Sequence, residues 1–197
     1  MKILIATFIT FSISLSYGKT VETCSFEFDV DNSKVEGTGY KYTEKTGVTA
    51  KFTGLKLHKV EKKPSIKELM KNVILTVDLM TLDSGNSLRD KNMRETLFSG
   101  ILGDSVVVVT VKEVGNKKID TEFKINEKTQ SVSFEYSIKG DSVVAKGKFG
   151  LLKFAMGDQI AALKKRCGSL HTGSDGKSVT WSEFALTLNA KFKKVCK

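Results

Sequence analysis

Apolar and polar residues alternate through most of this chain, and this pattern constrains the fold more than any other feature. In residues 24–30 every second residue is apolar, and the alternation returns in residues 132–138 and 184–192. Weaker alternation runs through residues 73–79 and 119–125. Side chains in a β-strand point to opposite faces in turn. Period two therefore predicts sheets with one dry face and one solvated face.

Turn-forming residues separate these runs. Asn126-Glu127-Lys128 and Lys139-Gly140-Asp141 leave gaps of hairpin size between neighbouring strands, and residues 106–111 form a continuous β-branched stretch. Many antiparallel strands with alternating faces are typical of a sandwich or a barrel. The fold class predicted from the pattern is therefore mainly all-β.

Three segments break the alternation and predict short helices. The first runs from Pro64 to about Asn72, with Pro64 at the first helical position. The second has Ser87 as N-cap and Asp90 three residues later, and ends near Gly100. The third begins at Gly157-Asp158 and stops at Gly168.

The amino terminus has the pattern of a secretory signal peptide. Lys2 precedes a charge-free apolar run over residues 3–17, which is shorter than the roughly 20 residues of a membrane span. Ser16-Tyr17-Gly18 fits a signal-peptidase site. We expect residues 1–18 to be removed and residues 19–197 to form one domain in the periplasm or outside the cell. The alternative is a buried N-terminal helix.

The chain is strongly basic, with 32 Lys and Arg against 22 Asp and Glu and a net charge of +10. Only Arg89, Arg94 and Arg166 are arginines, and base readout in nucleic acids favours arginine. We therefore expect no nucleic acid partner. Either the lysines solvate the surface, or they attract anionic membrane headgroups or a phosphorylated ligand.

Motifs for catalysis are weak. The sequence has no Gly-rich phosphate loop, no nucleophile elbow and no His-Glu-x-x-His. Cys167 and His171 are of metal-ligand type, but no second ligand pair has metal-site spacing. Ser169, His171 and Asp175 lie in one polar loop, which is only weak evidence for a catalytic triad. The expectation is a protein that is not an enzyme and has no metal.

The apolar strand faces leave one question open. They either fill the core completely or line an elongated apolar cavity. The candidate lining residues are Phe26, Phe28, Phe123, Phe134, Tyr136, Phe149, Phe184, Leu186 and Leu188.

Several segments, in this order and spacing, resemble the YceI-like family of secreted lipocalin-like barrels. Residues 77–86, followed by Arg89-Asp90 and Leu97-Phe98, are similar to the strand, turn and helix of that family. The other segments that carry the resemblance are residues 28–35, residues 40–48 with Phe52-Thr53-Gly54, Phe149-Gly150-Leu151, Leu170-His171 and Trp181. One departure is Asn32, where many members have His.

The resemblance implies an eight-stranded antiparallel lipocalin-like barrel with two or three short helices. It implies an amphiphilic lipid ligand, such as a polyisoprenoid or isoprenoid quinone, and no other cofactor. It carries over no catalytic residues. Asp90 is expected to act at the helix start, favourably placed for the dipole, and Arg89 to lie at the barrel mouth.

A barrel that closes with its last strand beside its first would bring Cys196 near Cys24. The two share inward parity with Phe192 and Phe28, so this pair is favoured, although pairs with Cys167 stay open. We expect the protein to bind, sequester or transport an elongated amphiphilic lipid in the cell envelope. The alternative is a closed barrel that acts through its lysine-rich surface on membrane or an acidic partner.

Overall fold

Eight antiparallel strands form a closed barrel in the computed structural model, which describes residues 22–58 and 61–196. Each strand pairs with the next, and the last pairs with the first. This confirms both the all-β class and the eight-stranded barrel. The expected signal peptide, residues 1–18, lies outside the described residues. The strands are β1 (Cys24–Lys41), β2 (Thr46–His58), β3 (Ile74–Asp83), β4 (Val106–Val114), β5 (Lys118–Ile125), β6 (Lys128–Lys139), β7 (Ser142–Gly150) and β8 (Thr180–Cys196).

The inward faces of the strands form the core. Along β3, Leu75, Val77 and Leu79 are buried, whereas the residues between them are partly exposed. The continuous valine run of β4 obeys the same rule, since Val107 and Val109 are buried and their neighbours less so. Period two therefore decides which side chains enter the barrel.

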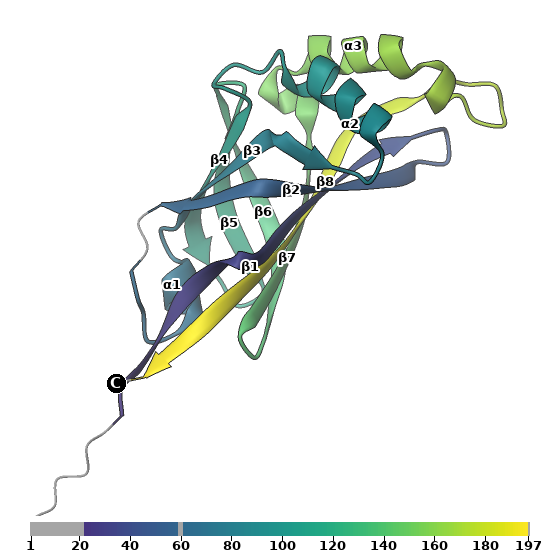
Figure 1. Ribbon diagram of the computed structural model, residues 1–197. Helices are drawn as coiled ribbons and strands as arrows, with labels where there is room; N and C mark the ends of the chain where they lie inside the picture. Colours follow the sequence, from purple (N-terminus) through teal and green to yellow (C-terminus); the bar gives the residue numbers. More distant parts are fainter. Residues whose placement is uncertain (1–21, 59–60, 197) are drawn as a thin grey trace, which may run out of the picture.

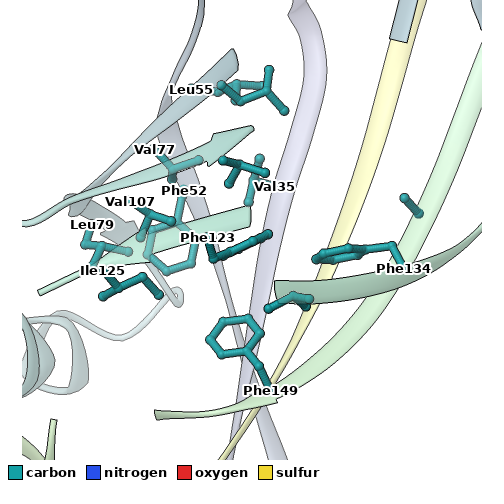
Figure 2. Close-up of a cluster of buried hydrophobic side chains, with 14 of the residues drawn as sticks. Val35, Phe52, Leu55, Val77, Leu79, Val107, Phe123, Ile125, Phe134 and Phe149 are labelled. Atoms are coloured by element: carbon teal, nitrogen blue, oxygen red, sulfur yellow. The ribbon is translucent and has the colours of Figure 1, made fainter. Parts of the chain in front are cut away.

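Aromatic side chains fill the middle of the barrel. The ring centroid of Phe123 lies 5.5 Å from that of Phe134 and 5.5 Å from that of Phe149. Figure 2 shows these three rings in one cluster with Val35 and Phe52. An eight-stranded barrel is just wide enough for such side chains to fill it.

The helices are divided between the two ends of the barrel. Figure 1 shows α2 (Ser87–Met93) and α3 (Gly157–Cys167) together over one end, whereas α1 (Ile66–Met70) lies toward the other. Short helical segments adjoin them: η1 (Arg94–Phe98), η2 (Leu151–Phe154) and η3 (Ser169–His171). None of the helices in the described part of the chain has the length and apolar character needed to cross a bilayer.

Two predicted helix starts were wrong. The first helix is capped by Ser65, whose hydroxyl accepts a hydrogen bond from the Glu68 N–H at 3.2 Å, so Pro64 precedes the cap. The second is capped by Asn86 rather than Ser87, because the Asn86 amide oxygen accepts from the Arg89 N–H at 2.9 Å. Asn and Ser are nearly equal as N-caps, so composition did not separate these neighbours. The predicted third helix, from Gly157 to a stop at Gly168, is confirmed.

A β-bulge interrupts the pairing of β1 with β8. The register shifts between Asp29 and Lys34. Asn32 donates to the buried Asp29 carboxylate at 2.8 Å and Ser33 donates to the Asp29 backbone carbonyl at 2.7 Å. The Asn32 hydrogen bond, assisted by Lys193, lowers the pKa of Asp29. Asn32 therefore has a structural role, as the hydrogen-bond donor to the Asp29 carboxylate within the bulge.

Candidate functional site

A cavity lies at the end of the barrel that α2 and α3 cover. Its volume is about 490 Å³, within the range of about 300–1,000 Å³ that small-molecule sites occupy. We call it the outer cavity. Its lining comes from β1, β2, β3 and β8 on the barrel side and from α2, η1, η2, α3 and η3 on the helical side.

Apolar side chains of the helices form the roof of the outer cavity. Met93 of α2, Leu97 of η1, and Ile160 and Leu163 of α3 all line it. Ile160, Leu163 and Cys167 recur at intervals of three and four residues, which places them on one face of α3. This spacing therefore supplies an apolar face over the barrel mouth.

Two glycines on the inward face of β1 shape the barrel side. A Cβ on Gly39 would meet no heavy atom within 4 Å, so this position opens directly into the outer cavity. Gly37 differs, since a Cβ there would lie 2.4 Å from Phe184 Cζ and 2.9 Å from Phe52 Cε2. Glycine at position 37 therefore leaves room for two aromatic rings, and glycine at position 39 leaves room for a ligand.

A π-helical turn presents the roof residues of η1. The Ser99 N–H donates to the Arg94 carbonyl at 2.8 Å, across five residues. Such turns are rare and are frequently found at functional sites. The Arg94 guanidinium donates to the carbonyls of Met80 and Leu82, which attaches η1 to the end of β3. We infer that this attachment fixes the side chains of Leu97 and Phe98 against the cavity.

Asp90 holds the loop between β3 and α2. Its buried carboxylate accepts hydrogen bonds from the Ser84 N–H at 3.0 Å and from the Ser84 hydroxyl. Asp90 lies in the first turn of α2, as expected. Nothing in the sequence indicated its two hydrogen bonds with Ser84. Arg89 is exposed and lines the outer cavity, in keeping with a place at the mouth.

Polar groups gather at the rim between β1 and η3. Lys41 lines the cavity, and its ammonium donates to the Leu170 carbonyl at 3.4 Å. His171 Nδ1 lies 2.6 Å from the Thr180 hydroxyl oxygen. Burial, and secondarily the Lys41 charge, lower the pKa of His171. This shift favours the neutral imidazole at pH 7. The cavity lining also carries the positive charges of Lys41 and Arg89.

Cys167 is a free, buried thiol in the roof. Burial raises the pKa of the Cys167 thiol, against the opposite effects of the Arg166 charge and an Asn92 hydrogen bond. A thiol with a raised pKa stays protonated and is a poor nucleophile. Cys167 accordingly behaves as part of the apolar lining.

The weak catalytic candidates of the late loop do not come together. His171 is bound to Thr180, whereas the Asp175 carboxylate accepts from the Thr43 hydroxyl at 2.7 Å and from the Lys177 N–H at 3.0 Å. Within residues 22–58 and 61–196, one group of three side chains of the kinds that bind metals lies close together: Glu22, Cys24 and Cys196. The two cysteines of this group form a disulfide, so their sulfurs are not free thiolates.

A second, smaller cavity of about 50 Å³ lies deeper in the barrel. We call it the inner cavity. Its lining is entirely apolar and comes from all strands except β6, together with η1 and η2 residues and Met156. Five residues line both cavities; we call them the partition, and they are Phe52, Leu97, Phe98, Leu151 and Phe184.

Most of the predicted lining residues lie elsewhere. Of the nine, Phe184 lines both cavities, and Phe123, Phe149 and Leu186 line the inner one. The correction concerns the other five, which line neither cavity because they pack into the filled core or against its edge: Phe26, Phe28, Phe134, Tyr136 and Leu188. For Tyr136, the hydroxyl also donates to the Gly115 carbonyl at 2.7 Å.

The disulfide joins Cys24 to Cys196, the pair that barrel closure favoured, at a sequence separation of 172. The two cysteines are register partners of β1 and β8. Figure 1 shows this corner of the barrel far from the helices that cover the outer cavity.

Comparisons with known proteins agree with this architecture. The family model of the YceI-like domain matches residues 24–192. A solved structure of a polyisoprenoid binding domain from Saccharophagus degradans is similar, with a TM-score of 0.58, 14% identity, and coverage of 85% of this chain and 97% of the other. Burkholderia cenocepacia BcnA has a TM-score of 0.56, 12% identity, and coverage of 84% and 99%. No curated protein matches the sequence. At these identities the two structures show the shared fold.

Proposed function

This chain belongs to the YceI-like family, and from that premise we propose that it binds an elongated amphiphilic lipid in the outer cavity. The ligand class is a polyisoprenoid or isoprenoid quinone-like molecule, which the protein sequesters or transports. The observation that carries the proposal is the outer cavity itself, about 490 Å³ of space between an apolar helical roof and an open β1 surface. The polyisoprenoid binding domain with the same fold adds support.

Binding of this kind needs few polar groups. Burial of apolar surface contributes about 0.8 kcal/mol per methylene, so a tail of several carbons gives useful affinity on its own. The apolar part of the ligand would lie against Met93, Leu97 and Ile160, and its polar head would lie at the rim near Lys41 and Arg89. The arrangement matches a general feature of small-molecule sites, in which a few polar groups orient a mainly apolar ligand.

The proposed place of action is the cell envelope. The N-terminal pattern of residues 1–18 favours export, and disulfides form and persist mainly in oxidising compartments. The Cys24–Cys196 disulfide supports the same compartment. The lysine-rich surface would then favour peripheral contact with an anionic membrane during loading.

The function proposed is binding rather than catalysis. His171 and Asp175 have separate hydrogen-bond partners, and the Cys167 thiol has a raised pKa. The closed-barrel alternative, acting only through surface lysines, requires a filled interior. The outer cavity favours the lipid-binding function over it.

The first experiment is native mass spectrometry of the mature protein isolated from its own envelope, followed by organic extraction. A stoichiometric lipid in the complex supports the proposal and identifies the ligand class. Protein that is bare, and that also fails to take up added isoprenoid quinone, contradicts it.

A matched pair of variants tests whether the outer cavity is the site. Gly39→Leu places a side chain in open space inside the cavity and should abolish or strongly weaken lipid uptake. Gly150→Leu is the control, because a Cβ there also meets nothing within 4 Å but Gly150 lines neither cavity. Equal lipid uptake by both variants would place the ligand elsewhere.

A further inference from the structure

The partition consists of apolar side chains that face both the outer and the inner cavity. Phe52 and Phe98 are buried, and their ring centroids lie 6.2 Å apart. Phe184 joins them over Gly37, where a Cβ would meet both the Phe184 and the Phe52 rings. Leu97 and Leu151 complete the partition from η1 and η2. The outer cavity therefore has an aromatic floor.

Packed side chains lie directly below this floor. The Phe184 ring lies 5.8 Å from Phe149, which in turn lies 5.5 Å from Phe123. Figure 2 shows Phe123 and Phe149 in the cluster that fills the barrel interior. The inner cavity, at about 50 Å³, is about one-tenth the volume of the outer one. An apolar chain that enters from the mouth thus meets packed aromatic rings, with little further space beyond them.

We propose that Phe184, together with Phe52 and Phe98, sets the maximum length of the apolar chain, so that the protein selects short-tailed amphiphiles. This inference rests on the proposed function and narrows its ligand class. A longer tail must either remain in solvent beyond the mouth or displace an aromatic ring from the floor. Since solvent-exposed methylenes add no burial, affinity should stop rising once the outer cavity is full.

Phe184 is the member of the partition best suited to a test. It is half-buried and packs against the core, whereas Phe52 and Phe98 are almost fully buried. Shortening Phe184 to Leu removes ring atoms between the two cavities and keeps an apolar side chain. Phe149→Leu is the matched control, because Phe149 lines the inner cavity and contacts Phe184 but is not part of the partition.

The experiment measures dissociation constants of the delipidated protein for geraniol, farnesol, geranylgeraniol and solanesol, a series of increasing isoprenoid length. In the wild type, affinity should rise by up to about fourfold for each additional buried methylene and then level off within the series. In Phe184→Leu the affinity should stop rising at a longer alcohol than in the wild type. In Phe149→Leu it should stop rising at the same alcohol as in the wild type. Circular dichroism and thermal melting establish that each variant is folded.

The possible outcomes separate the two proposals. Wild-type affinity that keeps rising to solanesol, or a length profile that Phe184→Leu does not alter, overturns the role of the partition while lipid binding stands. A shift of equal size in Phe149→Leu also overturns it, because core packing in general would then set the limit. A wild-type protein that binds none of the alcohols contradicts the proposed function and this inference with it.

Discussion

A Cβ atom on Gly37 would lie 2.4 Å from Cζ of Phe184, so the aromatic ring occupies the space that any other side chain at position 37 would need. We expect Gly37→Ala to lower the free energy of unfolding by about 1–3 kcal/mol, the usual cost of overpacking a core. Urea denaturation measures the change. Gly39→Ala is the control on the same strand face, where a Cβ meets nothing within 4 Å, and it should be neutral or slightly stabilising. A Gly37→Ala variant as stable as Gly39→Ala would show that Phe184 moves away at little cost.

The disulfide should contribute substantially to stability. Replacing both Cys24 and Cys196 with Ser should lower the free energy of unfolding by about 2–5 kcal/mol, because the bridge limits the conformations of the unfolded chain. Alkylation of the unfolded, unreduced protein checks the pairing and should label Cys167 alone. A peptide map with Cys167 in the bridge would contradict the assignment.

Removal of the Asp90 carboxylate should loosen the connection between β3 and α2. Asp90→Ala leaves the Ser84 N–H and hydroxyl without their acceptor, which should cost about 1–3 kcal/mol of unfolding free energy. Asp83→Ala is the matched control, since its carboxylate is exposed and accepts only from the Gly85 N–H in the same loop. Chemical denaturation of both variants should show a clearly larger loss for Asp90→Ala. Equal losses would mean that Asp90 acts through its charge at the helix start rather than through Ser84.

His171 should make stability depend on pH. Its pKa in the folded protein is lowered below the ordinary value of 6.5 by burial and by Lys41. At pH values between the folded and the unfolded pKa of His171, the unfolded chain binds more protons than the folded protein. The stability that neutral His171 contributes is therefore complete above about pH 6.5 and is lost as the pH falls toward the pKa of the folded protein. Melting temperatures from pH 8 to pH 5 should fall less steeply in His171→Gln than in the wild type. An NMR titration that finds the pKa of His171 at or above 6.5 would refute the argument.

Much of the barrel could be predicted from alternation, because each strand has one buried and one solvated face. The pairing of Cys24 with Cys196 followed from the same parity once the barrel was taken as closed. The order of the segments that resemble the YceI-like family added the number of strands. The alternation and the family segments are local patterns in the sequence, which is why one sequence is enough to find them.

The site could be predicted only in part. The large aromatic residues of the strand faces, such as Phe134, were assigned to a cavity, whereas they fill the core. Much of the actual wall comes from helices between strands and from small residues, which the alternation of the strands does not mark. The one signal that could have found the site is Gly37-x-Gly39, two glycines at consecutive inward positions of a strand. The π-helical turn at η1 has no comparable sequence signal.

The pairing of β1 with β8 also has a consequence for how the fold forms. These are the first and last strands of the chain, and contacts between such distant segments slow the folding of β proteins. All other strand pairs of the barrel join neighbours along the chain. With the bridge intact, the one non-local pairing becomes a local one, so the oxidised chain should refold with a much lower effective contact order than the reduced chain.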